Sequence, residues 1–333
     1  MTTNKIFIQF YLLIFILFIF PSLAFAFDTS RPGPENIPTK VKILLYVVDI
    51  DGINDAAQTF KANIFIEVKW KDQRLASSNE KTTYHLEDIW NPKLQIVNRQ
   101  KVFKTFPEIV EVDSEGTVVY KQRFIGDFSQ PLDLHSFPLD QQKLEILIIS
   151  GGNSPNEINL IEESIGISEK LSIPDWDILG INLKKIEYKF LPNIPADEGM
   201  VLEINAKRFL LFYIFKFLVP LFLIVFMSWI VFWIDPANYT SQISVSITSM
   251  LTLIAYQFLA VSSLPAVPYL TRMDIIMFLS TLLVFASLIE VGITSVLAQR
   301  NEVELARSID NYCKYLFPII FTLLFITTHF ISL

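Results

Sequence analysis

The chain has 333 residues, of which 52% are hydrophobic and 18% charged, and its formal net charge is −7. This composition is too apolar for an ordinary soluble protein, and the acidic balance excludes a nucleic-acid partner. The single cysteine, Cys313, excludes an internal disulfide. No phosphate-binding loop, metal-ligand spacing or catalytic triad occurs in the sequence, so we predict neither an enzyme nor a cofactor.

The first 26 residues have the order of a secretory signal peptide. Lys5 precedes an apolar run, and the small-residue site Ala24-Phe25-Ala26 follows it. We predict cleavage after Ala26; a retained membrane anchor is the alternative. Residues 27–207 are then expected outside the cytoplasm. They hold 28 acids and 20 bases, a net charge of −8, which would enrich cations in an enclosed cavity or simply keep the domain soluble.

Residues 27–207 are predicted to form an extracellular or periplasmic all-β domain. In the segment 59–70, every second residue is apolar, which is typical of a strand with one buried face. We predict further strands within 40–50, 93–98, 116–128, 143–150 and 177–190. Turn signals such as Asp51-Gly52 separate them. Many short strands without an interleaved helical pattern favour a β-sandwich.

Four apolar segments follow, at 209–234, 239–261, 275–298 and 315–331. Each is close to the roughly 20 residues of helix that cross a bilayer, so residues 208–333 are predicted to be a transmembrane domain. With the β-domain outside, four crossings also return the C-terminus to the outside. The segments left in the cytoplasm are too short to hold a signalling domain.

The second apolar segment carries a regular stripe. Its members are spaced 4, 3, 4, 3 and 4 residues apart and therefore share one helix face: Ser244, Thr248, Leu251, Ala255, Phe258 and Ser262. Close helix packing and the wall of a water-filled pathway both fit such a stripe. A transporter site would require inverted repeats, which are not found. One face of one helix can enclose a pore only in a ring of identical chains.

Several segments, in the right order, resemble the pentameric ligand-gated ion channels of the Cys-loop receptor superfamily. The segment 128–144, FSQPLDLHSFPLDQQKL, is similar to the signature loop of that family through Phe137, Pro138 and Asp140. Gln130 and Leu144 stand where animal members have the two cysteines of the loop. DIWNPKLQIVN, SWIVFW and LPAVPYLT resemble the family's Trp-x-Pro segment, its first membrane helix and its second-to-third helix loop.

The missing disulfide and the signal peptide resemble the bacterial branch of the family, and its proton-gated members most of all. The resemblance implies a homopentamer in the bacterial inner membrane, in which each chain has four further copies of itself as partners. The second helix would line the pore, with hydroxyl rings at Ser244 and Thr248 and an apolar gate at Leu251, Ala255 and Phe258. Monovalent ions, with cations favoured, would pass through it. The alternative is a membrane-anchored periplasmic binding module that does not conduct.

The resemblance also implies a coupling site where the two domains meet. Asp55, Asp140 and Arg208 match a carboxylate–arginine–carboxylate cluster of the family, and Pro265 and Tyr269 match the loop that receives its motion. A plain structural ion pair is the alternative use of such a cluster. Glu290, inside the third helix, is expected to be either functional or paired in the interior.

A small-molecule agonist is expected to bind between subunits, at Phe65, Tyr188 and Phe190. The segment 150–153, SGGN, stands where an aromatic residue is expected, so the agonist stays unidentified. Gln58 and Leu253 replace a glutamate and a histidine of the proton-gated relative, which argues against the same proton gating. At the cytoplasmic mouth, the neutral residues 240–242 replace an acidic ring, and Asp235 is the nearest acid.

Overall fold

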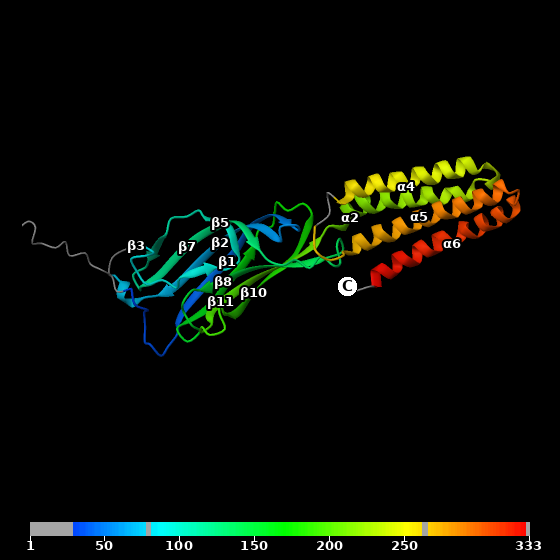
Figure 1. The fold of residues 1–333 in the computed structure, drawn as a ribbon. Coiled ribbons are helices and arrows are strands. Elements are labelled where there is room, and N and C mark those ends of the chain that lie inside the picture. The colour runs from blue at the N-terminus through cyan, green and yellow to red at the C-terminus, as the bar shows by residue number, and fades with distance from the viewer. Residues whose placement is uncertain (1–28, 78–80, 262–265, 331–333) are drawn as a thin grey trace, which may run out of the picture.

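The computed structural model describes residues 29–77, 81–261 and 266–330, with no side-chain detail at 329 and 330. The predicted signal peptide, Ser262 and Pro265 lie outside the described residues. Figure 1 shows two parts that lie end to end: a domain of strands, and four long helices that continue away from it. The described chain is thus a β-sandwich followed by four apolar helices, as predicted.

Seven strands form the larger sheet, in the order β3-β6-β7-β2-β1-β9, with β5 also paired to β7. Their bounds are β1 Thr39–Asn54, β2 Thr59–Lys71, β3 Thr82–His85, β5 Arg99–Lys104, β6 Ile109–Val112, β7 Thr117–Ser129 and β9 Ile158–Ile167; the short 3-10 helix η1 covers Gln73–Leu75. Most neighbours are antiparallel, but β1 and β9 are parallel.

Four strands form the second sheet, in the order β10-β11-β8-β4. They are β4 Leu94–Ile96, β8 Gln141–Ser150, β10 Trp176–Tyr188 and β11 Asp197–Arg208. In the β10–β11 pair, Trp176 lies directly opposite Arg208. This register places an aromatic ring beside the last residue of the β-domain, where the chain enters the membrane helices.

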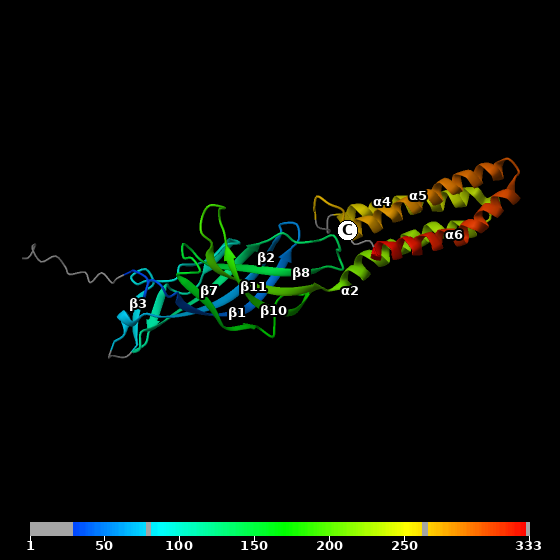
Figure 2. The same ribbon diagram turned by 90° about the horizontal axis from the view of Figure 1, so that it is seen from below.

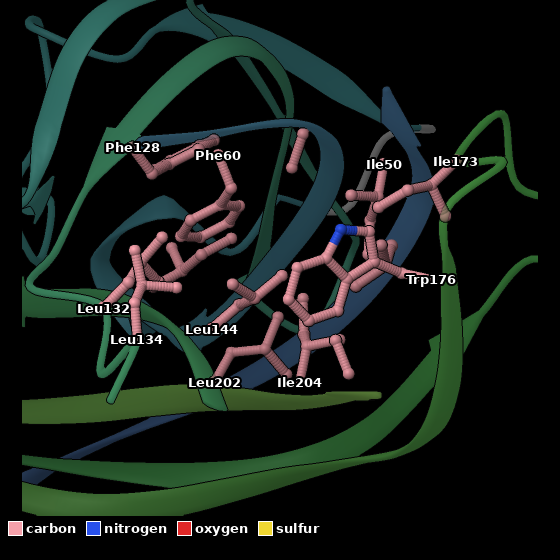
Figure 3. Packing of buried hydrophobic residues seen from close by; sticks show 14 of the residues in the cluster. Ile50, Phe60, Phe128, Leu132, Leu134, Leu144, Ile173, Trp176, Leu202 and Ile204 are labelled. Atoms are coloured by element: carbon pink, nitrogen blue, oxygen red, sulfur yellow. The ribbon is translucent and has the colours of Figure 1, made fainter. Parts of the chain in front are cut away.

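The core lies between the two sheets. The predicted inner face of β2 is confirmed, because its alternate residues from Phe60 to Trp70 are buried. Phe60 stacks on Phe128 of β7 with ring centres 5.4 Å apart. Figure 3 shows these rings beside Leu132 and Leu134 of the signature loop. Burial of each such side chain contributes about 1.5–3 kcal/mol, so the loop is anchored by its leucines.

The sequence pattern missed five strands: β3, β5, β6, β9 and β11. Four of them lack a long alternation. In β11 the reason is different, because every residue from Glu198 to Ile204 is buried, on both faces of the strand. Such a strand shows no period of two, and its polar members Glu198 and Glu203 conceal the apolar run.

The first membrane helix is divided into α2 Leu210–Tyr213, the π-helix η2 Ile214–Leu218, α3 Val219–Ile230 and the 3-10 helix η3 Val231–Trp233. Pro220 lies in the first turn of α3. Since proline has no N–H, it cannot bond to the preceding turn, and the widened π turn next to it is a usual adjustment at such a site.

The remaining helices are η4 Pro236–Asn238, α4 Tyr239–Val261, α5 Arg272–Gln299 and α6 Val303–Phe330. α5 begins three residues before the expected 275, because Thr271 and Asp274 form a capping box. α6 begins at Val303 rather than at the expected 315. Its first turns are amphipathic rather than apolar, so hydropathy does not detect them. α4 contacts α3 and α5, and α6 contacts α5. The helices run side by side in both views (Figures 1 and 2).

Candidate functional site

Arg208, the last residue of β11, lies between two loops of the β-domain and the first membrane helix. Its Nε and Nη2 donate to the two carboxylate oxygens of Asp140, at 2.7 and 3.0 Å. Its Nη1 and Nη2 donate to those of Asp55, both at 2.9 Å. Nη1 also donates to the hydroxyl of Tyr213 at 3.2 Å. All five guanidinium N–H groups therefore have an acceptor, and each carboxylate is held by two bonds.

This junction cluster of Asp55, Asp140 and Arg208 is buried among aromatic rings. The side chains of Arg208 and Asp140 are each 2% exposed. The guanidinium carbon lies 4.1 Å from the ring centre of Trp176 and 4.7 Å from that of Phe137. Burial alone would lower the pKa of Arg208, but its hydrogen bonds with Asp140 and Asp55 outweigh burial and raise it. Arg208 therefore stays charged.

Two glutamines surround the junction cluster. The amide of Gln142 donates to Asp140 Oδ2 at 2.7 Å and to the carbonyl of Asp133 at 2.6 Å. Gln58, in the β1–β2 turn, donates to the carbonyl of Asp55 and accepts from the N–H of Leu132, both at 2.6 Å. Gln58 thus joins the turn to the signature loop with a side chain that does not titrate.

Tyr269 connects the signature loop to the segment before α5. Its hydroxyl donates to the carbonyl of Leu132 at 3.2 Å and accepts from the N–H of Leu134 at 3.1 Å. Its ring stacks on His135 with centres 4.0 Å apart, and the N–H of Arg272 donates to the His135 carbonyl at 2.9 Å. In the same loop the Phe137–Pro138 peptide is cis. Three hydrogen bonds and one ring stack connect the signature loop to the segment before α5 and to the first residue of α5.

Gln130 closes the signature loop at the position where animal relatives have a cysteine. Its amide donates to the carbonyl of Lys143 at 2.7 Å, and its oxygen accepts from the N–H of Glu145 at 2.6 Å. The two bonds lie on either side of Leu144, whose own side chain is fully buried. Two hydrogen bonds to the backbone of β8 thus connect the two ends of the loop without a covalent bond.

The α4 helix has two faces of different character. One face is buried against the other helices and carries Gln242, Ser246, Ser249, Leu253 and Ala260. The opposite face is the predicted stripe, and its described members Ser244, Thr248, Leu251, Ala255 and Phe258 are all exposed in the single chain. The hydroxyls of Ser244 and Thr248 bond to carbonyls of their own helix, at 2.9 and 2.7 Å. The stripe therefore takes no part in packing within the chain.

At the far end of the bundle, Asp235 caps η4 by accepting from the N–H of Ala237 at 3.0 Å. It also pairs with Arg307 of α6 at 3.2 Å. Asp235, the acid nearest to the neutral residues 240–242, is therefore paired within the chain. Glu290 is buried in the interior of the bundle.

The three expected agonist residues are not brought together within one chain. Tyr188 and Phe190, at the end of β10, form an edge-to-face pair with ring centres 5.0 Å apart, and Phe190 is exposed. Phe65 belongs to the other sheet and packs against Phe106 at 6.2 Å. Two chains side by side could bring the two aromatic pairs together.

Trp176, Tyr213 and Gln142 contact the junction cluster but were not predicted from the sequence. Tyr213 lies in α2, only five residues after Arg208 in the sequence. Trp176 becomes a neighbour only through the β10–β11 register, which requires the unpredicted strand β11.

Comparisons with known proteins agree with this architecture. The family model described as "Neurotransmitter-gated ion-channel ligand binding domain" matches residues 27–192, and "Neurotransmitter-gated ion-channel transmembrane region" matches residues 217–304. The chain is 28% identical over 305 residues to the proton-gated ion channel of Gloeobacter violaceus, covering 89% of this chain and 84% of that protein.

The chain is also 27% identical over 303 residues to the glycine receptor subunit beta of Rattus norvegicus and of Mus musculus, covering 83% of this chain but only 60% of either subunit. Within the described residues, four helices are long and apolar enough to cross a membrane. Together these findings support the predicted multi-pass location in a bacterial inner membrane, with the β-domain outside. The chain belongs to the family of pentameric ligand-gated ion channels.

Proposed function

We propose that five copies of this chain form a ring that conducts small monovalent ions, and that an agonist on the β-domains opens it. One observation carries the proposal: the stripe on α4 is exposed in the single chain, whereas the face that carries Gln242, Ser249 and Leu253 is buried against the other helices. Hydroxyls at one end and large apolar groups beyond them suit a water-filled pathway with a hydrophobic gate. Packing within the chain, the alternative use of the stripe, does not account for it.

The junction cluster is proposed to couple the agonist site to the pore. It joins the β1–β2 turn, the signature loop and the first membrane helix through one guanidinium. Tyr269 attaches the same loop to the segment that precedes α5. A small rotation of the β-domain would therefore be transmitted to the membrane helices at two points, one on each side of α4 in the chain.

The agonist is proposed to bind between neighbouring subunits, with Tyr188 and Phe190 on one side and Phe65 on the other. The neutral segment 150–153 supplies no ring, so the site differs from a complete aromatic cage for an ammonium group. We propose cation selectivity on the net charge of −8 of residues 27–207. Because Asp235 is paired with Arg307, we expect the mouth of the pore to contribute less to cation selectivity than the β-domains do.

Current through purified, reconstituted protein tests the proposal. The full-length chain in planar bilayers should pass current when a screen of external pH values and small amines reaches its agonist. The reversal potential in a salt gradient should then shift toward that of the cation. A chain that binds a screened compound, yet never conducts, would instead be a binding module anchored in the membrane.

A further inference from the structure

Two carboxyl groups from different helices meet inside the membrane bundle. Glu290 of α5 lies within hydrogen-bonding reach of Asp310 of α6. Both are nearly inaccessible, with 9% and 1% of their surfaces exposed. The amide of Gln242, which is fully buried on α4, donates to Asp310 Oδ2 at 3.0 Å and to the carbonyl of Ile234 at 2.9 Å. Three helices thus converge on one acidic pair.

The hydrogen bonds of this acidic pair are incomplete. Both carboxyl oxygens of Glu290, Oδ1 of Asp310 and Oε1 of Gln242 are buried without a donor. An unsatisfied buried acceptor costs about 1–3 kcal/mol, and a buried unpaired charge costs more. Two facing carboxylates have only acceptor oxygens, so they cannot satisfy each other. The two carboxyl groups lack a donor between them, and one proton would supply it.

The charged groups around the acidic pair do not supply that donor. Lys314 of α6 faces Asp310 but its Nζ donates to Asn311 at 2.7 Å. Asp235, at the start of η4, faces Asp310 as a further negative charge, and Arg307 binds Asp235 and Glu304 instead. The thiol of Cys313 lies within hydrogen-bonding reach of Glu290, but a thiol is only a weak donor. Among the residues that the structure describes, no group of three or more potential ligands could hold a metal ion.

We propose that Glu290 and Asp310 bind one proton between them, taken from the cytoplasmic solution, and that this proton holds α6 against α5 and, through Gln242, against α4. The protonated carboxyl donates to the ionised one, so the acidic pair carries a single negative charge. Two like charges in one low-dielectric site favour this state over two ionised groups. Loss of the proton leaves two carboxylates in contact, and their repulsion loosens α6.

Infrared spectroscopy of the purified full-length protein tests the proton directly and needs no agonist or current. At neutral pH the wild type should show the carbonyl stretching band of a buried protonated carboxyl. The band should be lost in the double variant Glu290→Gln/Asp310→Asn, whose amides keep the size of both groups. Glu304→Gln, which removes an exposed carboxyl from the same helix, should keep the band. A wild-type spectrum identical to that of the double variant at neutral pH would overturn the proposal.

Thermal unfolding gives a second measurement if the double variant assembles poorly. The folded wild type keeps a proton that the unfolded chain releases at neutral pH, so its stability should fall as pH rises. The single variants Glu290→Gln and Asp310→Asn should each lose this pH dependence, whereas Glu304→Gln should keep it. The same pH dependence in all four proteins would contradict a shared proton.

The expected effect on current depends on the proposed channel function, whereas the binding of a proton by Glu290 and Asp310 does not. In excised patches, alkaline solution on the cytoplasmic face should change the agonist response of the wild type several-fold and leave the double variant unchanged. A chain without any current, but with the infrared band, would refute the channel and retain the proton site.

Discussion

At the scale of single residues, Arg208 satisfies two requirements that usually conflict, because it is both charged and almost fully buried. Two carboxylates, one hydroxyl and the faces of Trp176 and Phe137 replace the water that its guanidinium loses. Such a site specifies one arrangement of loops, since no smaller set of partners would satisfy all five donors. Only arginine has the planar fork that this geometry requires.

We predict that Arg208→Ala abolishes agonist-evoked current or prevents assembly. The substitution leaves Asp55 and Asp140 as neighbouring unpaired acids, and removal of one partner of a buried pair costs about 3–5 kcal/mol. Gating states commonly differ by only a few kcal/mol, so one state would become trapped. Currents at matched surface expression measure the effect. Arg208→Lys should rescue poorly, because an ammonium group cannot bind two carboxylates bidentately.

Lys207→Ala is the matched control, because Lys207 is the preceding residue of β11 and is exposed. It should keep the wild-type dose–response. If Arg208→Ala also kept it, the junction cluster would be a plain structural ion pair without a role in coupling.

A second residue prediction concerns Gln130. Gln130→Ala removes both bonds that close the signature loop on β8, which should lower stability by about 1–2 kcal/mol. The melting temperature of the full-length protein in detergent should fall by several degrees. Gln141→Ala, which truncates an exposed glutamine at the start of β8, should leave it unchanged. Equal melting temperatures for the two variants would show that Leu144 and its neighbours hold the loop without the amide.

At the scale of elements, α4 has one buried face and one exposed face, and the two differ in composition. Its buried face contacts α3 and α5, while its exposed face carries hydroxyls near the start and large apolar side chains farther along. Leu251 and Leu253 are only two residues apart, yet their exposed fractions are 61% and 0%. They therefore provide a matched pair of positions for separating pore function from packing.

We predict that Leu251→Ser gives a channel that leaks at rest or opens at lower agonist concentration. A ring of hydroxyls at a dry constriction lets water persist there, which lowers the barrier to ions. Resting conductance and the half-maximal agonist concentration measure the change. Leu253→Ser, on the buried face, should instead reduce the yield of assembled protein. An unchanged resting leak and unchanged activation in Leu251→Ser would argue against a gate at this position.

The elements differ in how far the sequence predicts them, for physical reasons. β2 has one buried face, so its residues alternate and the strand is evident. β11 is buried on both faces and carries Glu198 and Glu203, so no period marks it. The start of α6 was missed because only one stripe of it is buried. The residues of that stripe are spaced 4, 3 and 4 apart, as on one face of a helix, so the sequence could have predicted it: Ala306, Asp310, Cys313 and Phe317.

The residues of the candidate site that belong to a motif were predictable from the sequence. The residues that strand register brings to the site were not. Asp55, Asp140 and Arg208 follow from the resemblance, and the structure brings them together. Trp176 joins them only through pairing of β10 with β11. At position 130 the sequence showed only that the cysteine of the family is absent. It did not predict the hydrogen bonds by which Gln130 closes the loop. Hydrogen bonds between residues far apart in sequence leave no local pattern.

At the scale of the whole molecule, the β-domain and the helices lie end to end and meet in one area (Figure 1). The chain crosses that area once within the described residues, at Arg208 and Phe209. The signature loop and the Tyr269 segment supply the other contacts. This arrangement supports the proposed coupling, because a displacement of the β-sandwich would reach the helices through only a few bonds.

The last prediction concerns assembly. In the single chain Phe258 is 79% exposed and Leu251 61%, on a helix face that also carries Ser244 and Thr248. Apolar side chains would suit a lipid-facing surface better than these hydroxyls do. One chain, however, cannot enclose water with one helix face. A closed ring of identical chains resolves both conflicts, because each copy turns the same face to a common axis. We therefore expect a homopentamer in mild detergent, with native mass spectrometry giving five times the mass of the processed chain. Detection of monomers or dimers alone, across detergents that keep the protein folded, would rule out the ring and with it the pore on α4.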